Sequence, residues 1–121
     1  MALQTPQVNI QIDQKDDDAM WAQIIKVRVK PGREDDLRSI LEQIHAAEQA
    51  ESGLLRSSMM RDQKDPQVLY MMIVVESEEK ARVRERDPRR EELHDLQAKM
   101  ADTLEGPPEF IDLEVINEIA F

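Results

Sequence analysis

The 121-residue sequence contains no cysteine and three glycines, and 3% of its residues are aromatic. Without cysteine, the chain has no disulfide scaffold, no thiol nucleophile and no cysteine metal site. Its glycines all stand at the ends of predicted elements and do not form a phosphate-binding loop. The scarcity of aromatic side chains argues against stacking platforms for single-stranded nucleic acid.

Long apolar runs are also missing. None approaches the ~20 residues of a membrane span, and the N-terminus lacks the basic and apolar regions of a signal peptide. The formal net charge of −10 repels phosphate backbones. His45 and His94, the two histidines, lack a chelating spacing, so we expect no metal site. We therefore expect a cytoplasmic protein that binds neither membranes nor nucleic acid.

The most apolar run covers residues 68–75 and follows the turn-forming residues 62–66. Both alternating sets of side chains in this run are apolar, which predicts a strand covered on both faces. The chain's own helices can cover one face. The other face needs a second layer, so we expect a homodimer formed through this open sheet face.

Hydrophobic periodicity predicts the order strand, helix, strand, strand, helix, strand. The predicted strands cover residues 20–30, 54–62, 68–75 and 109–119. The predicted helices cover residues 33–52, 78–86 and 88–104, the last two interrupted at Asp87-Pro88. This order is that of the α+β ferredoxin-like βαββαβ fold, a four-stranded antiparallel sheet with helices on one face.

The N-terminal residues 1–19 are predicted to form an arm, and residues 20–121 a single domain. Val8, Ile10 and Ile12 alternate with polar residues before an acidic run. The arm is interpreted as a solvated linker. The alternative is a segment that lies along a neighbouring subunit through these three apolar residues.

Four short motifs occur in order between residues 20 and 119. They are VKPG at 29–32, ESGLLR at 51–56, RD at 61–62 with DP at 65–66 and ESEE at 76–79, and GPPE at 106–109. Together they resemble the antibiotic biosynthesis monooxygenase (ABM) domain family, whose members form dimeric α+β barrels. The resemblance implies a pocket between the sheet and the helices of each subunit.

Members of this family differ in activity: some oxygenate aromatic polyketides with O2 and without metal or flavin, some degrade haem, and others have no known activity. The resemblance implies a cofactor-independent monooxygenase acting on a small aromatic or enolisable molecule. The alternative is a non-catalytic dimeric domain with a structural role or with a small hydrophobic or aromatic ligand. No cofactor is expected in either case.

Particular positions of the family pattern are changed in this chain. The third strand of the family usually carries Glu and then Trp, and the corresponding residues here are Ile73 and Val75. Of the residues typical of haem-degrading members, an Asn is replaced by Ile25, whereas the axial His corresponds to His94. A weaker alternative function is therefore haem binding through His94, which is otherwise interpreted as a half-exposed residue on the flank of a helix.

Four residues are candidates for catalysis: Trp21, His45, Arg56 and Tyr70. Trp21 and Tyr70 are common as core residues with a polar tip, but in a cofactor-free oxygenase they would position a phenolate substrate. His45 is a candidate general base or an ordinary helix residue. Arg56 is a candidate partner for a buried carboxylate or ligand. Tyr70 lines the pocket only if its side of the strand meets the helices; otherwise it lies at the dimer interface.

Six basic residues cluster between Lys80 and Arg90 in an otherwise acidic chain. We interpret them as ion-pair partners of neighbouring acidic residues, each pair contributing little to stability. The alternative is a binding site for an anionic ligand.

Overall fold

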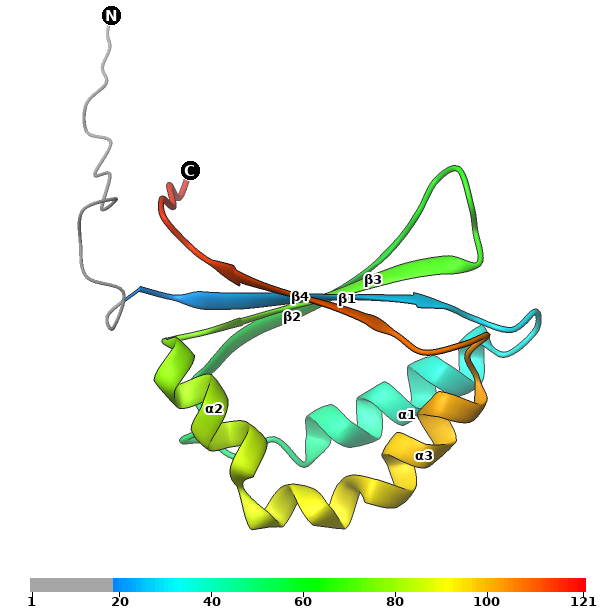
Figure 1. The fold of residues 1–121 in the computed structure, drawn as a ribbon, viewed down its shortest axis with the longest axis horizontal. Coiled ribbons are helices and arrows are strands. Elements are labelled where there is room, and N and C mark those ends of the chain that lie inside the picture. Colours follow the sequence, from blue (N-terminus) through cyan, green and yellow to red (C-terminus); the bar gives the residue numbers. More distant parts are fainter. Residues whose placement is uncertain (1–18) are drawn as a thin grey trace, which may run out of the picture.

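A computed structural model describes residues 19–121, so the predicted N-terminal arm, apart from Ala19, lies outside the described range. Four strands form one antiparallel sheet, and the helices lie together on one of its faces (Figure 1). The strands are β1 (Trp21–Arg28), β2 (Leu54–Arg61), β3 (Val68–Val75) and β4 (Glu109–Glu114). The helical segments are α1 (Glu34–Ala46), α2 (Glu78–Arg86), the 3₁₀ helix η2 (Pro88–Leu93) and α3 (His94–Asp102). The predicted ferredoxin-like fold is confirmed.

The strand order β2-β3-β1-β4 places the two most apolar strands, β1 and β3, in the centre of the sheet. They pair along their whole length, from Trp21 opposite Val75 to Arg28 opposite Val68. The turn between β2 and β3 is held by Asp62, whose Oδ1 accepts hydrogen bonds from the backbone N–H groups of residues 64 and 65 at 2.8 and 3.1 Å. Asp62 therefore acts as the turn former that the sequence predicts.

Two helical segments begin at residues whose side chains cap the first turn. Ser77 Oγ accepts a hydrogen bond from the backbone N–H of Lys80 at 3.1 Å at the start of α2. Asp87 caps the next segment by accepting from the backbone N–H of Arg89 at 2.9 Å, and Pro88 occupies the first position. The predicted break at this point is confirmed. The turns that follow it are 3₁₀ rather than α-helical, as is common near helix ends.

Two predicted boundaries are wrong. The first helix ends at Ala46 and not at Ser52, because the chain turns there and brings Glu48 against Arg84. Gly53 has a left-handed φ of 85°, but it precedes β2 and does not cap a helix. The last strand ends at Glu114, after which the chain leaves the sheet.

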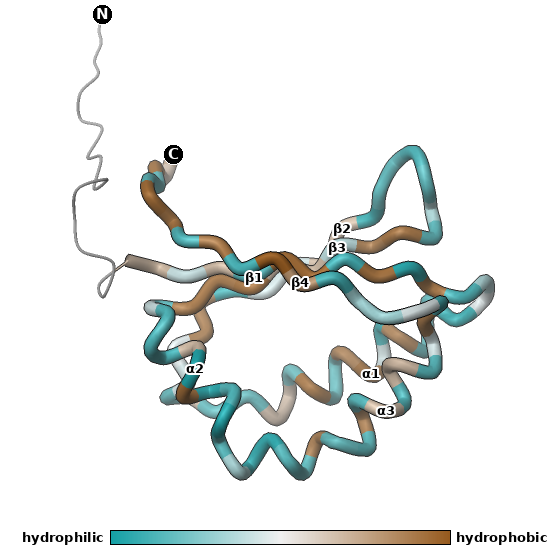
Figure 2. Tube along the Cα trace, viewed as in Figure 1, coloured by the Kyte–Doolittle hydropathy of each residue, from teal (hydrophilic) through white to brown (hydrophobic). Residues whose placement is uncertain are grey.

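The main core lies between the sheet and the helices. Val27, Leu37, Leu69 and Leu104 are each no more than 5% exposed and belong to one apolar cluster. Figure 2 shows the hydrophobic stretches along the sheet, whereas α2 is largely hydrophilic. No helix in residues 19–121 has the length and apolar character that crossing a membrane requires.

Candidate functional site

A cavity of about 420 Å³ lies between the sheet and the helices. Its apolar walls come from Ile25, Met59 and Met71 of the strands and from Leu41 and Met100 of the helices. We call this cavity the sheet–helix cleft. Its position is the one that the family resemblance implies.

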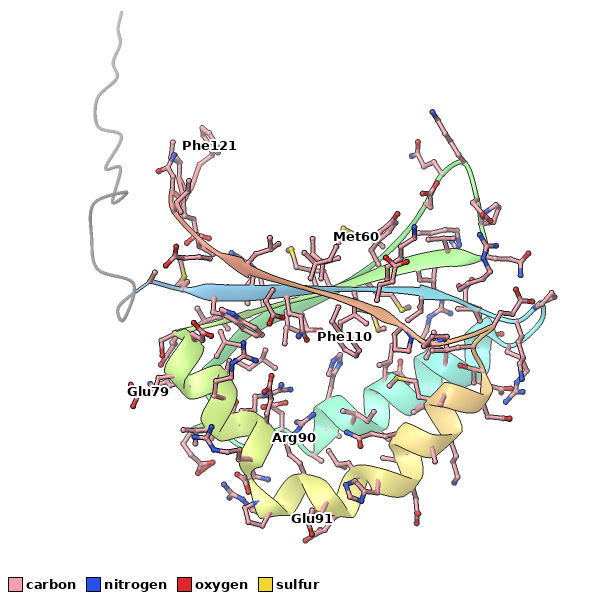
Figure 3. All side chains as sticks on the ribbon, viewed as in Figure 1. Met60, Glu79, Arg90, Glu91, Phe110 and Phe121 are labelled. Carbon is pink, nitrogen blue, oxygen red and sulfur yellow. The ribbon has the colours of Figure 1, made fainter. Side chains whose placement is uncertain are left out.

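The strand register explains which side chains reach the cleft. Ile25 of β1 lies opposite both Met71 of β3 and Phe110 of β4, and all three line the cleft. Side chains two residues apart share a sheet face, so Gln23 and Ile73 line it as well. In Figure 3, Phe110 extends from β4 towards the space beneath the sheet. The residue is 60% exposed, so the cleft is open to solvent beside it.

A His–Ser pair brings polar chemistry into the cleft. His45 stands in the last turn of α1, and Ser57 stands on β2 opposite Ile73. The distance from His45 Nε2 to Ser57 Oγ is 3.2 Å. When the imidazole proton is on Nδ1, the Ser57 hydroxyl donates to Nε2 and can accept a hydrogen bond from a bound ligand. The pair is therefore arranged to take a proton from a ligand through the hydroxyl.

Arg84 of α2 is neutralised by Glu48. Its Nε and Nη2 both donate to the Glu48 carboxylate at 2.7 Å, and the two side chains are 11% and 16% exposed. Burial raises the pKa of Glu48, but the hydrogen bonds from Arg84 and Ser52 outweigh it, so the pKa of the carboxyl lies below its usual value. The pair therefore remains charged and joins α2 to the segment after α1.

Arg90 of η2 is the second arginine that lines the cleft. Figure 3 shows it on the side of the helical layer that faces the sheet. Burial and the neighbouring charge of Arg84 lower its pKa, and no residue in the range 19–121 forms an ion pair with it. Arg90 is thus a cleft arginine without a carboxylate in ion-pair contact, although the charges of Glu48, Glu85 and Asp87 act on it at longer range.

The structure brings together two of the four candidate catalytic residues. Trp21 and His45 both line the cleft. Trp21 is 5% exposed, and the guanidinium carbon of Arg82 lies 5.0 Å from the centre of its ring. This is a cation–π contact, which keeps the indole in place.

Tyr70 and Arg56 lie on the opposite face of the sheet. Tyr70 follows the alternation that places Met71 in the cleft, and Lys26 Nζ lies 6.0 Å from the Tyr70 ring. Arg56 Nη2 donates to Glu118 at 2.6 Å. Of the two positions weighed for Tyr70, the structure shows the one away from the helices. Neither residue is among those that line the cleft.

His94, the residue considered for haem, begins α3 and is exposed. It does not line the sheet–helix cleft or either of two further cavities, one beside α2 and one between α1 and α3. Among residues 19–121, no cluster of three or more His, Asp or Glu side chains is placed to hold a metal ion.

Sequence reasoning did not identify Gln23, Ser57 and Phe110 of the cleft as site residues. It considered Arg84 and Arg90 only as members of the basic cluster, with an anionic ligand site as the alternative to ion pairing. Gln23 shares the predicted strand face of Trp21, and Ser57 that of Met59, so the alternation contained a usable signal. Nothing in the sequence shows which of the basic residues after Ser77 turns inward, because that depends on the bend at Asp87-Pro88.

The positions at which the family usually has Glu and Trp are both next to the candidate site. Val75 is completely buried and lies directly opposite Trp21 in the β1–β3 pairing. Ile73 lies between Gln23 and Ser57 on the neighbouring strands. The indole of Trp21 and the polar side chains of Gln23 and Ser57 thus lie around these positions. They are contributed by β1 and β2 and not by β3.

The fold and the cleft define a ferredoxin-like α+β protein with a binding cavity between sheet and helices. The sequence model of the family described as antibiotic biosynthesis monooxygenase (ABM) matches residues 20–96. The chain belongs to this family. None of the curated proteins matches the sequence significantly.

Solved structures agree with this fold. A Caulobacter crescentus protein that carries the family name has a TM-score of 0.70 at 16% identity, with 84% of this chain and 93% of that chain covered. One from Chloroflexus aurantiacus has a TM-score of 0.64 at 23% identity, with 84% and 97% covered. SnoaB, a cofactor-independent oxygenase from Streptomyces nogalater, has a TM-score of 0.68 at 10% identity, with 83% and 96% covered. At these identities the similarity shows the fold alone.

Proposed function

We propose that the protein is a cofactor-independent monooxygenase that oxidises a small aromatic or enolisable molecule. The observation that carries this proposal is the apolar cleft of about 420 Å³ into which the His45–Ser57 pair points. An apolar site excludes water and strengthens the interactions of the groups that remain inside it. Membership of the ABM family supports the choice of reaction.

The proposed reaction begins with a proton transfer. The Ser57 hydroxyl accepts a hydrogen bond from an acidic O–H or C–H group of the substrate, and His45 Nε2 takes up the proton through it. The product is an enolate or phenolate beside an imidazolium. The imidazolium charge and the Ser57 hydroxyl stabilise this anion where it forms.

The electron-rich anion then reduces O2. One electron passes to O2, and the two radicals combine to form a carbon–oxygen bond. The resulting peroxide anion takes back the proton from the His45 imidazolium and becomes a hydroperoxide. Loss of water from the peroxide leaves a carbonyl group, so that CH2 and O2 become C=O and H2O. One oxygen atom enters the product and the other enters water, and no external reductant is consumed.

We also propose that the protein acts as a homodimer formed through the sheet face opposite the helices. Met60 and Ile111 are each 45% exposed, and Leu113 is 40% exposed. By strand alternation Met60 lies on the same face as Tyr70, and Figure 3 shows it on the side away from the helices. A second copy packed on this face would bury these side chains.

Oxygen uptake tests the enzymatic proposal. A panel of anthrones, which carry the CH2 group that the proposed reaction oxidises, is incubated with the protein, and the products are analysed after reaction in ¹⁸O2. We expect uptake above the buffer rate and one labelled oxygen atom per product molecule. Uptake no faster than in buffer across the panel would contradict the proposal, as would label-free products.

The alternative function is a non-catalytic binding domain. It is favoured by the replacement of the usual Glu and Trp of the family by Ile73 and Val75. Ligand binding without oxygen uptake would support it. The weaker alternative, haem binding through His94, predicts a shift of the Soret band when haemin is added. Because His94 is exposed and outside the described cavities, we expect no such shift.

A further inference from the structure

The basic residues between Lys80 and Arg90 differ in whether they form ion pairs with acidic side chains. Arg82 pairs with Glu78, Glu85 and Asp112. Arg84 is held by Glu48 through two hydrogen bonds, and Arg89 pairs with Asp87 and Glu51. Arg90 is partly buried and, within residues 19–121, has no such partner. The interpretation of this cluster as ion pairs therefore accounts for Arg82, Arg84 and Arg89 but not for the exposed Arg86 or the partly buried Arg90.

Arg90 also stands between two cavities. The sheet–helix cleft contacts it on one side. A second cavity of about 390 Å³, here called the outer pocket, includes Ala47, Val83 and Leu93 in its lining. Arg84 and Arg90 are the two residues common to both linings. A ligand in the cleft therefore reaches Arg90 with the end that points towards the outer pocket.

We propose that Arg90 binds a carboxylate on the ligand, so that the protein selects aromatic acids over neutral aromatic molecules. This inference rests on the proposed function only in taking the ligand to have an aromatic body. The apolar side chains of the cleft hold that body, and the carboxylate lies at the arginine end, away from the reacting carbon.

Charge and geometry favour a carboxylate over a neutral polar group. A partly buried guanidinium without a partner has lost solvation that an anion restores. The planar guanidinium also donates two parallel hydrogen bonds, which fit the two oxygens of a carboxylate.

The net charge of the chain opposes the binding of an organic acid. At −10, the protein as a whole repels organic acids at long range. Preferential binding of an acid therefore requires a local cation that outweighs the overall field, and in the cleft the unneutralised arginine is Arg90.

Trp21 provides the test, since it is the only tryptophan and lines the cleft. Quenching of its fluorescence is titrated with anthraquinone-2-carboxylate and with anthraquinone-2-carboxamide. These two ligands have the same ring system and differ in charge. Their ring is already oxidised, so binding is measured without turnover. We expect the acid to bind at least about tenfold more tightly than the amide, as for a hydrogen-bonded charge pair.

Variants assign this preference to one residue. In Arg90→Gln, the affinity for the acid should fall to that for the amide, and Arg90→Lys should retain part of the preference. The matched control is Arg86→Gln, which removes the same charge from an exposed position that lines neither cavity. Thermal unfolding of each variant establishes that it is folded.

Three results would overturn the inference: equal affinities for acid and amide in the unsubstituted protein, no binding of the acid at millimolar concentration, or a preference that survives in Arg90→Gln. These results are separate from oxygen uptake. A protein that prefers the acid but consumes no oxygen would refute the proposed function and retain the role of Arg90.

Discussion

Arg84 and Glu48 connect α2 to the segment after α1 through two hydrogen bonds of 2.7 Å. The pair is largely shielded from solvent, with side-chain exposures of 11% and 16%. It also forms part of the lining of the outer pocket. The pair thus joins α2 to the segment after α1, and its Arg84 lies between the outer pocket and the sheet–helix cleft because it lines both.

Removing Arg84 should therefore destabilise the fold. Arg84→Met leaves the Glu48 carboxylate largely buried without its partner, and we expect the free energy of unfolding to fall by about 2–3 kcal/mol, somewhat less than for a fully buried pair. Urea denaturation measures this change. Arg38→Met is the matched control, because Arg38 is 49% exposed in its pairs with Glu34 and Asp35, and should cost at most about 0.5 kcal/mol. Equal losses in the two variants would contradict the prediction.

Acid should destabilise the protein through Asp87. Hydrogen bonds from the Arg89 side chain and backbone lower the pKa of Asp87 to about 2. A carboxyl whose pKa is depressed in the folded state stabilises the fold when it is ionised. This contribution is complete above its unfolded pKa of about 4 and is lost as the pH falls through about 2.

Urea midpoints measured across this acidic range test the role of Asp87. We expect the midpoint to fall on acidification, and Asp87→Asn to lower stability at neutral pH and to flatten the acid dependence. Asp95→Asn, at an exposed position of α3, is the matched control. An acid dependence that is the same in Asp87→Asn as in the unsubstituted protein would show that this carboxyl does not contribute.

The proposed general base is tested by two substitutions in the cleft. His45→Gln should lower kcat for oxygen uptake by about 100-fold, the usual order for loss of a general base. Ser57→Ala should give a smaller loss, because His45 can then take the proton directly or through water. Stopped or continuous oxygen-electrode assays measure both. His94→Gln and Ser39→Ala change the same residue types outside the cleft and should leave kcat unchanged; full activity in His45→Gln would exclude it as the base.

The homodimer is tested by placing a charge on the open sheet face. Leu113 is 40% exposed on β4, and Leu113→Asp should convert the dimer into a monomer because a buried unpaired carboxylate opposes association. Sedimentation velocity at micromolar concentration distinguishes the two states. Val83→Asp introduces the same charge at an exposed apolar position of α2 and should leave the dimer intact. A monomeric unsubstituted protein would contradict the proposed assembly.

The order of the elements follows from local patterns, and it was predictable. Alternation of apolar side chains predicts β1, β2 and β3, and helical spacing predicts α1. Ser77 and Asp87 are residue types that favour the start of a helix, and each caps the segment that follows it. The length of α1 was not predictable from spacing alone. It ends at Ala46 because the following residues bring Glu48 to a partner far along the chain.

The candidate site was only partly predictable. Trp21 and His45 were recognised as residue types that carry chemistry, and both line the cleft. Tyr70 was recognised for the same reason, but both faces of β3 are apolar, so the sequence contains no signal for which of them meets the helices. Comparison with the family pattern identifies the replacement of Glu and Trp by Ile73 and Val75. It does not identify Trp21, Gln23 and Ser57, on the adjacent strands, as residues of the site.

By itself, the sequence determined the family, the strand and helix order, and the turn and cap residues, because these depend on short-range periodicity and hydrogen bonding. The tertiary structure alone decided which polar groups share the cleft. His45 meets Ser57, and Arg84 meets Glu48 while Arg90 lacks a partner in the described chain, through the pairing of segments distant in sequence. Such contacts depend on sheet register and on the direction that the chain takes after the break at Asp87-Pro88. The local pattern predicts the break but not that direction.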